Sequence, residues 1–439
     1  MGARNTDIGV MTISLGCPKN RVDTERLLGA LGQGVHPVDD VADAELVLIN
    51  TCGFIEPAVE ESVSTILGAV ADMEELDGPR PVLAVAGCLV SRYGEDLARE
   101  MPEVDLWLTT DDLDAWPGLV RRALDREADA DLPRSLSTGP GYAYLKISEG
   151  CSHDCRFCTI PSIRGPHKSW SVDYLAAEAE SLVAQGVPEL VVVGQDSTHY
   201  GSDLGLENGL QQLMERLLPV PGLEWLRLMY LYPAGLTRNL LSFLRDAGKP
   251  FLPYFDIPLQ HAHPDVLASM GRPFARNPEK VVNRVREFFP EAALRTTLIV
   301  GYPGETEEHF ERLMDFVHQT RFHHLGVFPY WPEDGTPAAA MDNQVPDEIK
   351  LERRDAIMEL QAGISEEIMA GYVGETLPVL VEEPSPEWPG LFVGRTWFQA
   401  PDVDGVTYVS AQPGTELTPG TIVQAEVEDS KIYDLVALV

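Results

Sequence analysis

Three cysteines lie close together in the middle of the 439-residue chain, in the segment Gly150-Cys151-Ser152-His153-Asp154-Cys155-Arg156-Phe157-Cys158. The C-x3-C-x2-C spacing lets one loop wrap a soft metal centre, because thiolates favour iron–sulfur clusters and zinc. A structural zinc site takes four protein ligands, and no fourth cysteine or obvious histidine follows nearby. Three thiolates on a four-iron cluster would leave one iron open to another ligand. The alternative is three ordinary buried thiols, since a free cysteine often packs as a small apolar residue.

The composition limits the class of protein. Hydrophobic residues make up 44% of the chain, a share typical of a globular protein, and no apolar run has the length of a membrane span. The N-terminus lacks the apolar segment of a signal peptide, so a cytoplasmic protein is expected. Six cysteines in an unexported chain indicate metal binding or catalysis, not disulfides. The net charge of −36 opposes non-specific binding to nucleic acid.

The other three cysteines fall in a predicted first domain, residues 1–137. Its apolar runs at 10–15, 45–50, 82–86 and 104–108 alternate with helical patterns, which predicts an open parallel sheet covered by helices. Cys17, Cys52 and Cys88 each follow the carboxyl end of a predicted strand, and that edge is where ligands bind in open α/β sheets. We therefore expect the three to converge on a second cluster with one open iron. The alternative is three unrelated buried thiols.

A segment rich in Asp, Pro, Ser and Gly at 127–141 predicts a linker to a central domain, residues 138–371. Six strand-like runs separated by helical patterns predict a partial (β/α)6 barrel, whose ligand site should lie at the carboxyl ends of the strands. Polar and glycine-rich motifs occur at those ends, where the glycines let the backbone approach a nucleoside and the polar side chains could bond its ribose. For His261 and His263 a structural role is favoured over a ligand contact. The motifs are Gly194-Gln195-Asp196, Asp256-Ile257-Pro258-Leu259-Gln260-His261, Gly301-Tyr302-Pro303-Gly304-Glu305 and the segment 330–337.

The last domain, residues 372–439, has β-rich runs at 377–381, 391–396, 406–410 and 421–427. Separated by Pro, Gly and Asp, they predict a small antiparallel β-barrel. The domain holds eleven acidic residues against Arg395 and Lys431, although a barrel that grips RNA should carry a basic face. Trp397 and Phe398 are candidate exposed aromatics. The alternative is a module that only packs on the mouth of the central barrel.

The whole chain resembles the methylthiotransferases of the radical S-adenosylmethionine (SAM) superfamily. The order of domains is the same: an N-terminal methylthiotransferase domain, a radical SAM core and a TRAM barrel. The segments Ser14-Leu15-Gly16-Cys17-Pro18-Lys19-Asn20-Arg21-Val22-Asp23 and Asp256 to His261 resemble the branch that modifies small-subunit ribosomal protein twelve. The tRNA-modifying branch usually has Gln-Met or similar after the first cysteine, and Leu-Pro-Val-Gln-Ser-Gly at the second segment. Lys168-Ser169-Trp170 and Met270-Gly271-Arg272 depart from the pattern of many relatives, which affects substrate contacts but not the cysteines.

The resemblance implies roles for individual residues. Cys151, Cys155 and Cys158 would hold a [4Fe–4S] cluster that cleaves SAM, with Phe157 near the adenine. Cys17, Cys52 and Cys88 would hold an auxiliary [4Fe–4S] cluster that carries sulfur. A 5′-deoxyadenosyl radical would remove hydrogen from the β-carbon of an aspartate, and a second SAM would methylate the sulfur to be transferred. The predicted SAM-binding residues are Phe157, Gly194, Gln195, Asp196, Ile299 and Gly301.

Two competing functions remain open from the sequence: a tRNA adenosine methylthiotransferase with the same clusters, and a non-catalytic iron–sulfur factor for ribosome assembly. We expect a monomer that uses an electron donor and a sulfur source and binds neither membrane nor tRNA. Ribosomal proteins are generally basic, so an acidic barrel beside the active-site mouth would attract one by long-range steering. Asp402, Asp404, Glu426 and Glu428 are the predicted steering residues. The alternative is that these acids only keep the protein soluble.

Overall fold

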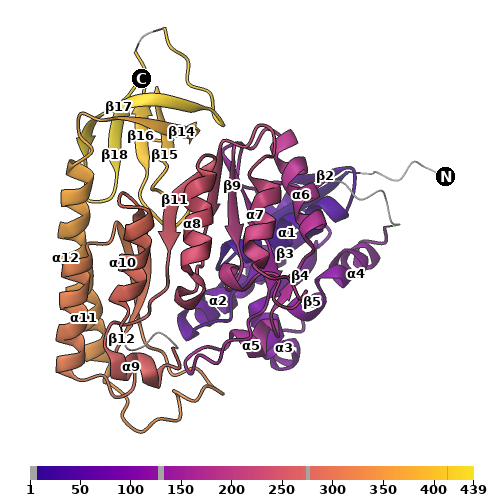
Figure 1. The fold of residues 1–439 in the computed structure, drawn as a ribbon. Helices are drawn as coiled ribbons and strands as arrows, with labels where there is room; N and C mark the ends of the chain where they lie inside the picture. The colour runs from indigo at the N-terminus through magenta and orange to yellow at the C-terminus, as the bar shows by residue number, and fades with distance from the viewer. Residues whose placement is uncertain (1–6, 127–132, 273–276, 413) are drawn as a thin grey trace. The chain divides into compact units, whose positions relative to one another are not determined.

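The computed structural model describes residues 7–126, 133–272, 277–412 and 414–439 (Figure 1). Their contacts form two compact units. The first unit contains the chain up to residue 137 together with 149–153 and 158–168, and the second contains 138–148, 154–157 and 169–439. The part of the predicted linker at 127–132 lies outside the described residues. Among the residues that are described, no helix is both long enough and apolar enough to cross a membrane.

The first unit is built on a five-stranded parallel sheet in the order β2-β1-β3-β4-β5, which confirms the predicted open α/β fold. Its middle strands are almost entirely buried, because helices cover both faces of the sheet. Side chains of α2 and α3 pack on one face, and those of α1 and α4 pack on the other. The strands are β1 (Ile8–Ser14), β2 (Val35–Pro37), β3 (Leu46–Thr51), β4 (Val82–Gly87) and β5 (Leu106–Leu108), and the helices are α1 (Pro18–Ala30), α2 (Glu56–Glu74), α3 (Cys88–Glu100), α4 (Trp116–Ala123) and α5 (Ile160–Arg164).

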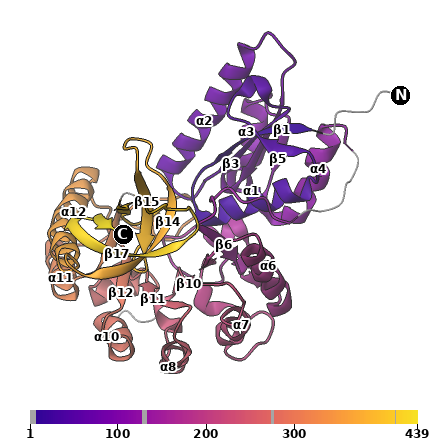
Figure 2. The same ribbon diagram turned by 90° about the horizontal axis from the view of Figure 1, so that it is seen from above.

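The second unit contains the predicted partial barrel, six parallel strands in the order β13-β12-β11-β10-β9-β6. Helices lie along the outer face of this curved sheet (Figure 2). The strands are β6 (Tyr142–Lys146), β9 (Glu189–Val193), β10 (Trp225–Leu228), β11 (Phe251–Asp256), β12 (Ala293–Val300) and β13 (His324–Pro329). The helices are α6 (Val172–Ala184), α7 (Gly209–Leu217), α8 (Arg238–Ala247), α9 (Pro264–Ser269), α10 (Glu279–Phe288) and α11 (Glu307–Thr320). The two short strands β7 (Ser148–Glu149) and β8 (Lys168–Ser169) pair with each other, and each has one residue in either unit.

One long helix, α12 (Asp347–Ala370), was not predicted. The surface that it buries is largely polar, so the sequence lacks the apolar stripe that marks most packed helices. Gln361 donates from Nε2 to the carbonyl oxygen of Phe322 at 2.8 Å, and Arg353 donates from Nη1 to Glu305 Oε1 at 2.8 Å. Hydrogen bonds and ion pairs therefore fix this helix where apolar packing usually would.

The C-terminal module is a closed barrel of five strands, one more than predicted. The added strand, β18, is a four-residue apolar run at the chain end and pairs parallel with β16, whereas all other pairs in the barrel are antiparallel. The sequence did not predict this strand, because so short a run shows no alternation of apolar and polar residues and is not followed by turn-forming residues. The strands are β14 (Thr376–Pro384), β15 (Leu391–Thr396), β16 (Thr407–Ser410), β17 (Ile422–Ser430) and β18 (Leu435–Leu438).

Buried ion pairs fix this barrel to the amino-terminal ends of the central strands, away from the carboxyl ends. Glu189 opens β9, and its two carboxylate oxygens accept from Arg227 Nε and Arg395 Nη2, each at 2.7 Å. All three side chains are at most 2% exposed. Arg227 Nη1 also donates to the carbonyl oxygen of Trp397 at 2.9 Å. The prediction that the acidic barrel lies beside the active-site mouth is therefore wrong.

Two of the four predicted steering acids have a structural role instead. The carboxylate of Asp404 is 1% exposed, accepts from Tyr254 at 2.7 Å and pairs with Arg295 at 3.3 Å. Asp402 accepts from the hydroxyls of Tyr142 and Tyr144 at 3.1 and 2.9 Å. These partners lie on the central strands, so both acids hold the barrel in place. The sequence could not reveal this, because their tyrosine and arginine partners are more than a hundred residues away.

The candidate exposed aromatics are also largely packed. Phe398 is fully buried and stacks on Tyr372, with ring centroids 4.4 Å apart. Trp397 is half-buried and lies edge-on to Phe398. Neither forms an open aromatic face of the kind on which nucleic-acid bases stack.

We predict that Glu189→Gln destabilises the protein by about 3–5 kcal/mol, because two buried arginines lose their shared counter-charge. Burial opposes ionisation of Glu189, but Arg395 and Arg227 outweigh it and hold its pKa below the ordinary 4.5. The stabilisation is thus present above pH 4.5 and is lost as the pH falls through the lowered pKa. The free energy of unfolding of the variant should therefore decrease less on acidification than that of the unsubstituted protein. Denaturant titrations from about pH 7 down to about pH 2, a range that includes the loss expected below pH 4.5, measure both effects.

A matched control is Asp173→Asn, which breaks the pair with Arg216 at 2.8 Å on the surface. Both side chains of that pair are more than half exposed, so its loss should change stability by less than about 1 kcal/mol. Equal destabilisation by the two variants would show that the buried network does not hold the barrel.

Candidate functional site

Cys17, Cys52 and Cys88 follow three neighbouring strands of the first unit. Cys52 directly follows β3 and Cys88 directly follows β4, and the last residues of these strands, Thr51 and Gly87, are register partners. Cys17 lies just beyond β1 and is the N-cap residue of α1. Parallel strands end at the same edge, so the three thiols come together as the sequence predicts.

Glycine at position 16 allows this close approach. A Cβ atom on Gly16 would lie 2.8 Å from Cys52 Cβ and 3.3 Å from its sulfur, and the backbone φ of +89° also favours glycine. Gly53 is similarly crowded, with the position of a Cβ atom only 2.7 Å from Leu89 Cα. The backbone of Cys52 is held by Ser62, whose Oγ accepts from its N–H at 3.1 Å and donates to its carbonyl at 2.9 Å.

The pKa values of the three thiols reflect burial, mutual repulsion and nearby cations. Burial raises the pKa of Cys52 to about 12, and negative charge on Cys88 or Cys17 contributes to the increase. The three sulfurs therefore lie close enough to interact electrostatically. Burial also raises the pKa of Cys88, although Arg164 partly opposes it. The pKa of Cys17 is lowered, since Lys19 and Arg164 outweigh its burial. A bound metal centre would offset the mutual repulsion of thiolates held this close together.

Arg164, at the end of α5, is a site residue that the sequence analysis missed. Its side chain is 1% exposed, and its Nε donates to the sulfur of Cys88 at 3.1 Å. Its other nitrogens bond Glu149 Oε1 at 2.8 Å and Asn20 Oδ1, and lie 3.5 Å from Asp23 Oδ2. Burial opposes its charge, but Glu149, Cys88 and Asp23 raise its pKa well above the usual value. The sequence gives one indication that Arg164 belongs to the site, namely that it follows Cys158 by six residues.

Asn20 braces the same edge of the sheet. Its side-chain nitrogen donates to the carbonyl oxygens of Leu15 and Thr51, at 2.9 and 3.0 Å. Its own carbonyl oxygen accepts from Asn50 at 2.8 Å. Part of the motif that follows Cys17 therefore links the loops after β1 and β3.

The triple-cysteine loop is shared between the two units, with Cys151 and Cys158 in the first and Cys155 in the second. Within the first unit, the amide of Cys151 donates to the carbonyl of Gly165 at 3.1 Å, so the two limbs of the loop pair with each other. The segment after Cys158 also contacts the sheet domain, because Thr110 Oγ1 donates to the carbonyl of Ile163 at 3.1 Å.

Within the second unit, Cys155 is held by an arginine. Arg272 Nη1 donates to its sulfur at 3.2 Å, and Nη2 donates to the carbonyl oxygen of Pro258 at 2.7 Å. The preceding Gly271 has a φ of +76°, and a Cβ atom there would lie 2.6 Å from the carbonyl oxygen of Asp154. The segment Met270-Gly271-Arg272, which departs from the pattern of many relatives, therefore lies close to the cysteine loop.

The predicted cofactor contacts Phe157 and Ile299 come together. Both pack against one apolar cluster, which contains Met270, Tyr302 and Tyr330. These residues come from the cysteine loop, from the end of β12 and from segments that follow α9 and β13. An aromatic and an aliphatic side chain in this arrangement suit the face of an adenine.

The motif after β9 includes a buried aspartate that caps the short helix following it. Asp196 is buried, and its Oδ1 accepts from the amide and the hydroxyl of Thr198 at 2.8 and 2.6 Å, so it caps the short 3-10 helix Ser197–His199. Gly194 lies where a Cβ atom would be 2.8 Å from Ser148 Oγ. Gln195 follows the same strand end and is half-buried.

The motifs after β11 and β12 are joined by a buried contact between a histidine and a carboxylate. His261 Nε2 lies 3.4 Å from Glu305 Oε2, and both side chains are 0% exposed. Glu305 also accepts from the amide of Gly301 at 3.0 Å. Burial lowers the pKa of His261 despite the nearby carboxylate, so this histidine is neutral at physiological pH. Its structural role, which the sequence analysis favoured, agrees with this geometry.

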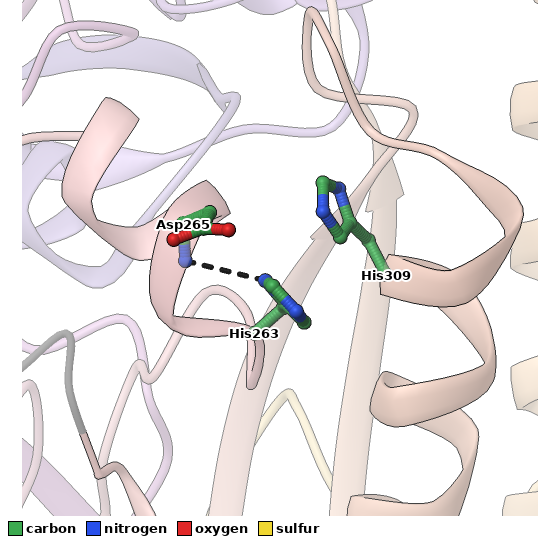
Figure 3. A group of neighbouring side chains, drawn as sticks. All are labelled: His263, Asp265 and His309. Atoms are coloured by element: carbon green, nitrogen blue, oxygen red, sulfur yellow. Dashed lines mark hydrogen bonds between the residues drawn. The ribbon is translucent and has the colours of Figure 1, made fainter.

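A separate polar cluster, His263, Asp265 and His309, has ligand atoms within 4.8 Å of one another (Figure 3). Both histidines take part in helix capping. His263 is the N-cap of α9, and its Nδ1 accepts from the amide of Asp265; His309 belongs to the capping box of α11, and its Nδ1 accepts from the amide of Thr306, each at 3.2 Å. An Nδ1 that accepts an N–H carries no proton, so in each neutral ring Nε2 holds the proton and offers no lone pair. This arrangement begins α9 and α11 and disfavours a metal ion.

Comparison with known families identifies the class of protein. Residues 145–317 match the model of the Radical SAM superfamily, residues 9–109 match the Uncharacterized protein family UPF0004, and residues 373–439 match the TRAM domain. A structure of the radical S-adenosylmethionine methyltransferase TsrM from Kitasatospora setae aligns with a TM-score of 0.56 at 14% identity, over 82% of this chain and 89% of that one. The fold is thus that of a radical SAM protein with a C-terminal TRAM barrel.

Full-length relatives narrow the class to one family. The ribosomal protein uS12 methylthiotransferase RimO of Oleidesulfovibrio alaskensis is 63% identical over 98% of this chain and 100% of its own length. The protein of the same name from Lawsonia intracellularis is 51% identical over 100% of this chain and 99% of its own length. The chain belongs to the ribosomal protein uS12 methylthiotransferase RimO family. Membership of the radical SAM superfamily implies a [4Fe–4S] cluster and SAM.

Proposed function

We propose that this protein is a radical SAM methylthiotransferase that modifies the β-carbon of an aspartate in ribosomal protein uS12. The observation that carries the proposal is the 62–63% identity, over the full length, to relatives that bear this name. All six cysteines of the chain also fall in two sets of three, one after strands of the first sheet and one in the central loop. Because the substrate is a ribosomal protein, the proposed location is the cytoplasm.

We further infer three domains, 1–137, 138–371 and 372–439, and two [4Fe–4S] clusters. Cys151, Cys155 and Cys158 would hold the cluster that binds SAM, while Cys17, Cys52 and Cys88 would hold the auxiliary cluster. The thiolate donor set suits iron, and in each set one sulfur accepts an arginine N–H, a contact common around iron–sulfur clusters. Three ligands per cluster leave one iron open.

The cofactors supply the radical chemistry when bound: reductive cleavage of SAM and delivery of a methylthio group. The protein orients them and excludes water. Phe157 and Ile299 would pack on the adenine, and the backbones at Gly194, Gln195 and Gly301 would line the nucleoside. Asp196 would act indirectly, by fixing the loop through its bonds to Thr198. We propose a monomer that takes electrons and sulfur from outside sources.

Two alternatives are separated from this proposal by their substrates or their chemistry. A tRNA adenosine methylthiotransferase would be expected to carry a basic TRAM barrel, and this barrel has eleven acidic residues against two basic ones. A non-catalytic assembly factor would bind clusters but release no 5′-deoxyadenosine.

The iron content of the protein tests the assignment of the cysteine ligands. Protein reconstituted without oxygen should bind about eight irons, four in each of two clusters. The triple variant Cys151→Ala, Cys155→Ala, Cys158→Ala should bind about half of that, because the auxiliary set remains. Iron and sulfide analysis measures the count, and an unchanged count in the triple variant would contradict the ligand assignment.

The two cysteine sets should also be separable by function. The triple variant Cys17→Ala, Cys52→Ala, Cys88→Ala should lose methylthio transfer yet keep measurable SAM cleavage, because the central domain carries the cleavage site. Chromatography of 5′-deoxyadenosine under reducing conditions measures this. Its complete absence in a variant with the native circular dichroism spectrum would argue against the division of roles.

The substrate is tested in cells. Deleting the gene should remove a methylthio group from an aspartate of ribosomal protein uS12 and leave tRNA modifications unchanged. Mass spectrometry of ribosomal proteins and of digested tRNA from the two strains measures both, with complementation by the intact gene as the control. Loss of a methylthiolated adenosine, with uS12 unaffected, would favour the tRNA enzyme instead.

A further inference from the structure

Arg164 belongs by sequence to the segment of the triple-cysteine loop, yet its guanidinium group lies in the other cysteine site. It closes α5, which begins two residues after Cys158. Its Nε–H donates to the sulfur of Cys88, one of the three thiols at the edge of the first sheet. All of these residues belong to the first unit, so the contact lies within one compact body.

The same guanidinium holds both limbs of the triple-cysteine loop. Glu149, two residues before Cys151, accepts from Arg164 Nη1 at 2.8 Å. From the sheet side, Asn20 Oδ1 accepts from Nη2, and Asp23 Oδ2 lies 3.5 Å from Nη1. The arginine and Asp23 side chains are 1% exposed, so solvent screens these contacts little. One side chain thus connects the start of the loop, its end and the Cys88 thiol.

We infer that Arg164 is a positioning residue of the auxiliary cluster, and that it makes the properties of this cluster depend on the loop that carries the other cysteine set. The inference rests on the proposed function, in that it takes Cys88 as a cluster ligand. Hydrogen bonds to ligand sulfurs and nearby positive charge stabilise the more negative, reduced state of a cluster and raise its reduction potential. Arg164 provides both.

A planar guanidinium is needed for this arrangement. Its fork directs three nitrogens at Cys88, Glu149 and Asn20 at once, whereas a lysine ammonium is a single point of charge on a flexible stem. Arg164→Lys therefore keeps the charge but loses the fixed N–H directed at sulfur. Arg164→Gln loses the charge as well.

The test isolates the auxiliary cluster in the full-length protein that carries Cys151→Ala, Cys155→Ala and Cys158→Ala. In that background, Arg164→Gln should lower the reduction potential of the remaining cluster and change its electron paramagnetic resonance spectrum. Arg164→Lys should lower the potential by less. A potentiometric titration monitored by electron paramagnetic resonance measures both effects, and circular dichroism verifies folding.

Arg272→Gln is the matched control, because Arg272 donates to Cys155, whose cluster is absent from this background. It should leave the potential and spectrum of the auxiliary cluster unchanged. Identical potentials with Arg, Lys or Gln at position 164, in folded protein that retains its cluster, would overturn the inference. If the cysteine variant retains no cluster at all, the two-cluster proposal itself fails. Should Arg164→Gln not fold, a potential for Arg164→Lys equal to that of arginine overturns the inference.

Discussion

Parallel pairing of β1, β3 and β4 is the constraint on which the first cysteine site depends. Because the strands run in one direction and Thr51 pairs with Gly87, the residues that follow them emerge at one edge. Each strand is buried by helices on both faces, so its register is strongly fixed. A slip of one residue would move every side chain to the opposite face and separate the thiols. The positive φ values of Gly16 and Gly87 then turn the chain sharply enough for the sulfurs to approach.

The central sheet uses its two ends for different purposes. At the carboxyl ends, Asp196 caps the short helix after β9, and the buried pair of His261 and Glu305 joins the motifs after β11 and β12. At the amino ends, Glu189, Arg227, Arg295 and the tyrosines of β6 and β11 bind the C-terminal barrel. Buried ion pairs are costly when broken, which makes the barrel an integral part of this unit. Its acidic composition follows partly from this, since Asp402 and Asp404 serve the interface.

Arginine has a recurring role at the sulfur sites. Arg164 donates to Cys88 in the first unit and Arg272 donates to Cys155 in the second. Each arginine also binds a carbonyl or carboxylate of a neighbouring segment, so each is rigidly held before any cluster is present. Ligand sulfurs with preformed N–H donors need little rearrangement when a metal centre binds.

The sequence by itself determined the kinds of sheet, the positions of most strands and the alignment of Cys17, Cys52 and Cys88, because these follow from local apolar runs and from the rule that parallel strands end together. Through the family resemblance it also indicated Phe157 and Ile299 as residues of one cofactor site. Only the tertiary structure decided that α12 packs through polar side chains, that β18 closes the barrel, and that this barrel meets the amino ends of the central strands. The contact of Arg164 with Cys88 was likewise decided only by the tertiary structure. The partners in these contacts are mostly tens to hundreds of residues apart, and a charged residue that will be buried by such a partner has the same local sequence as one that stays in solvent.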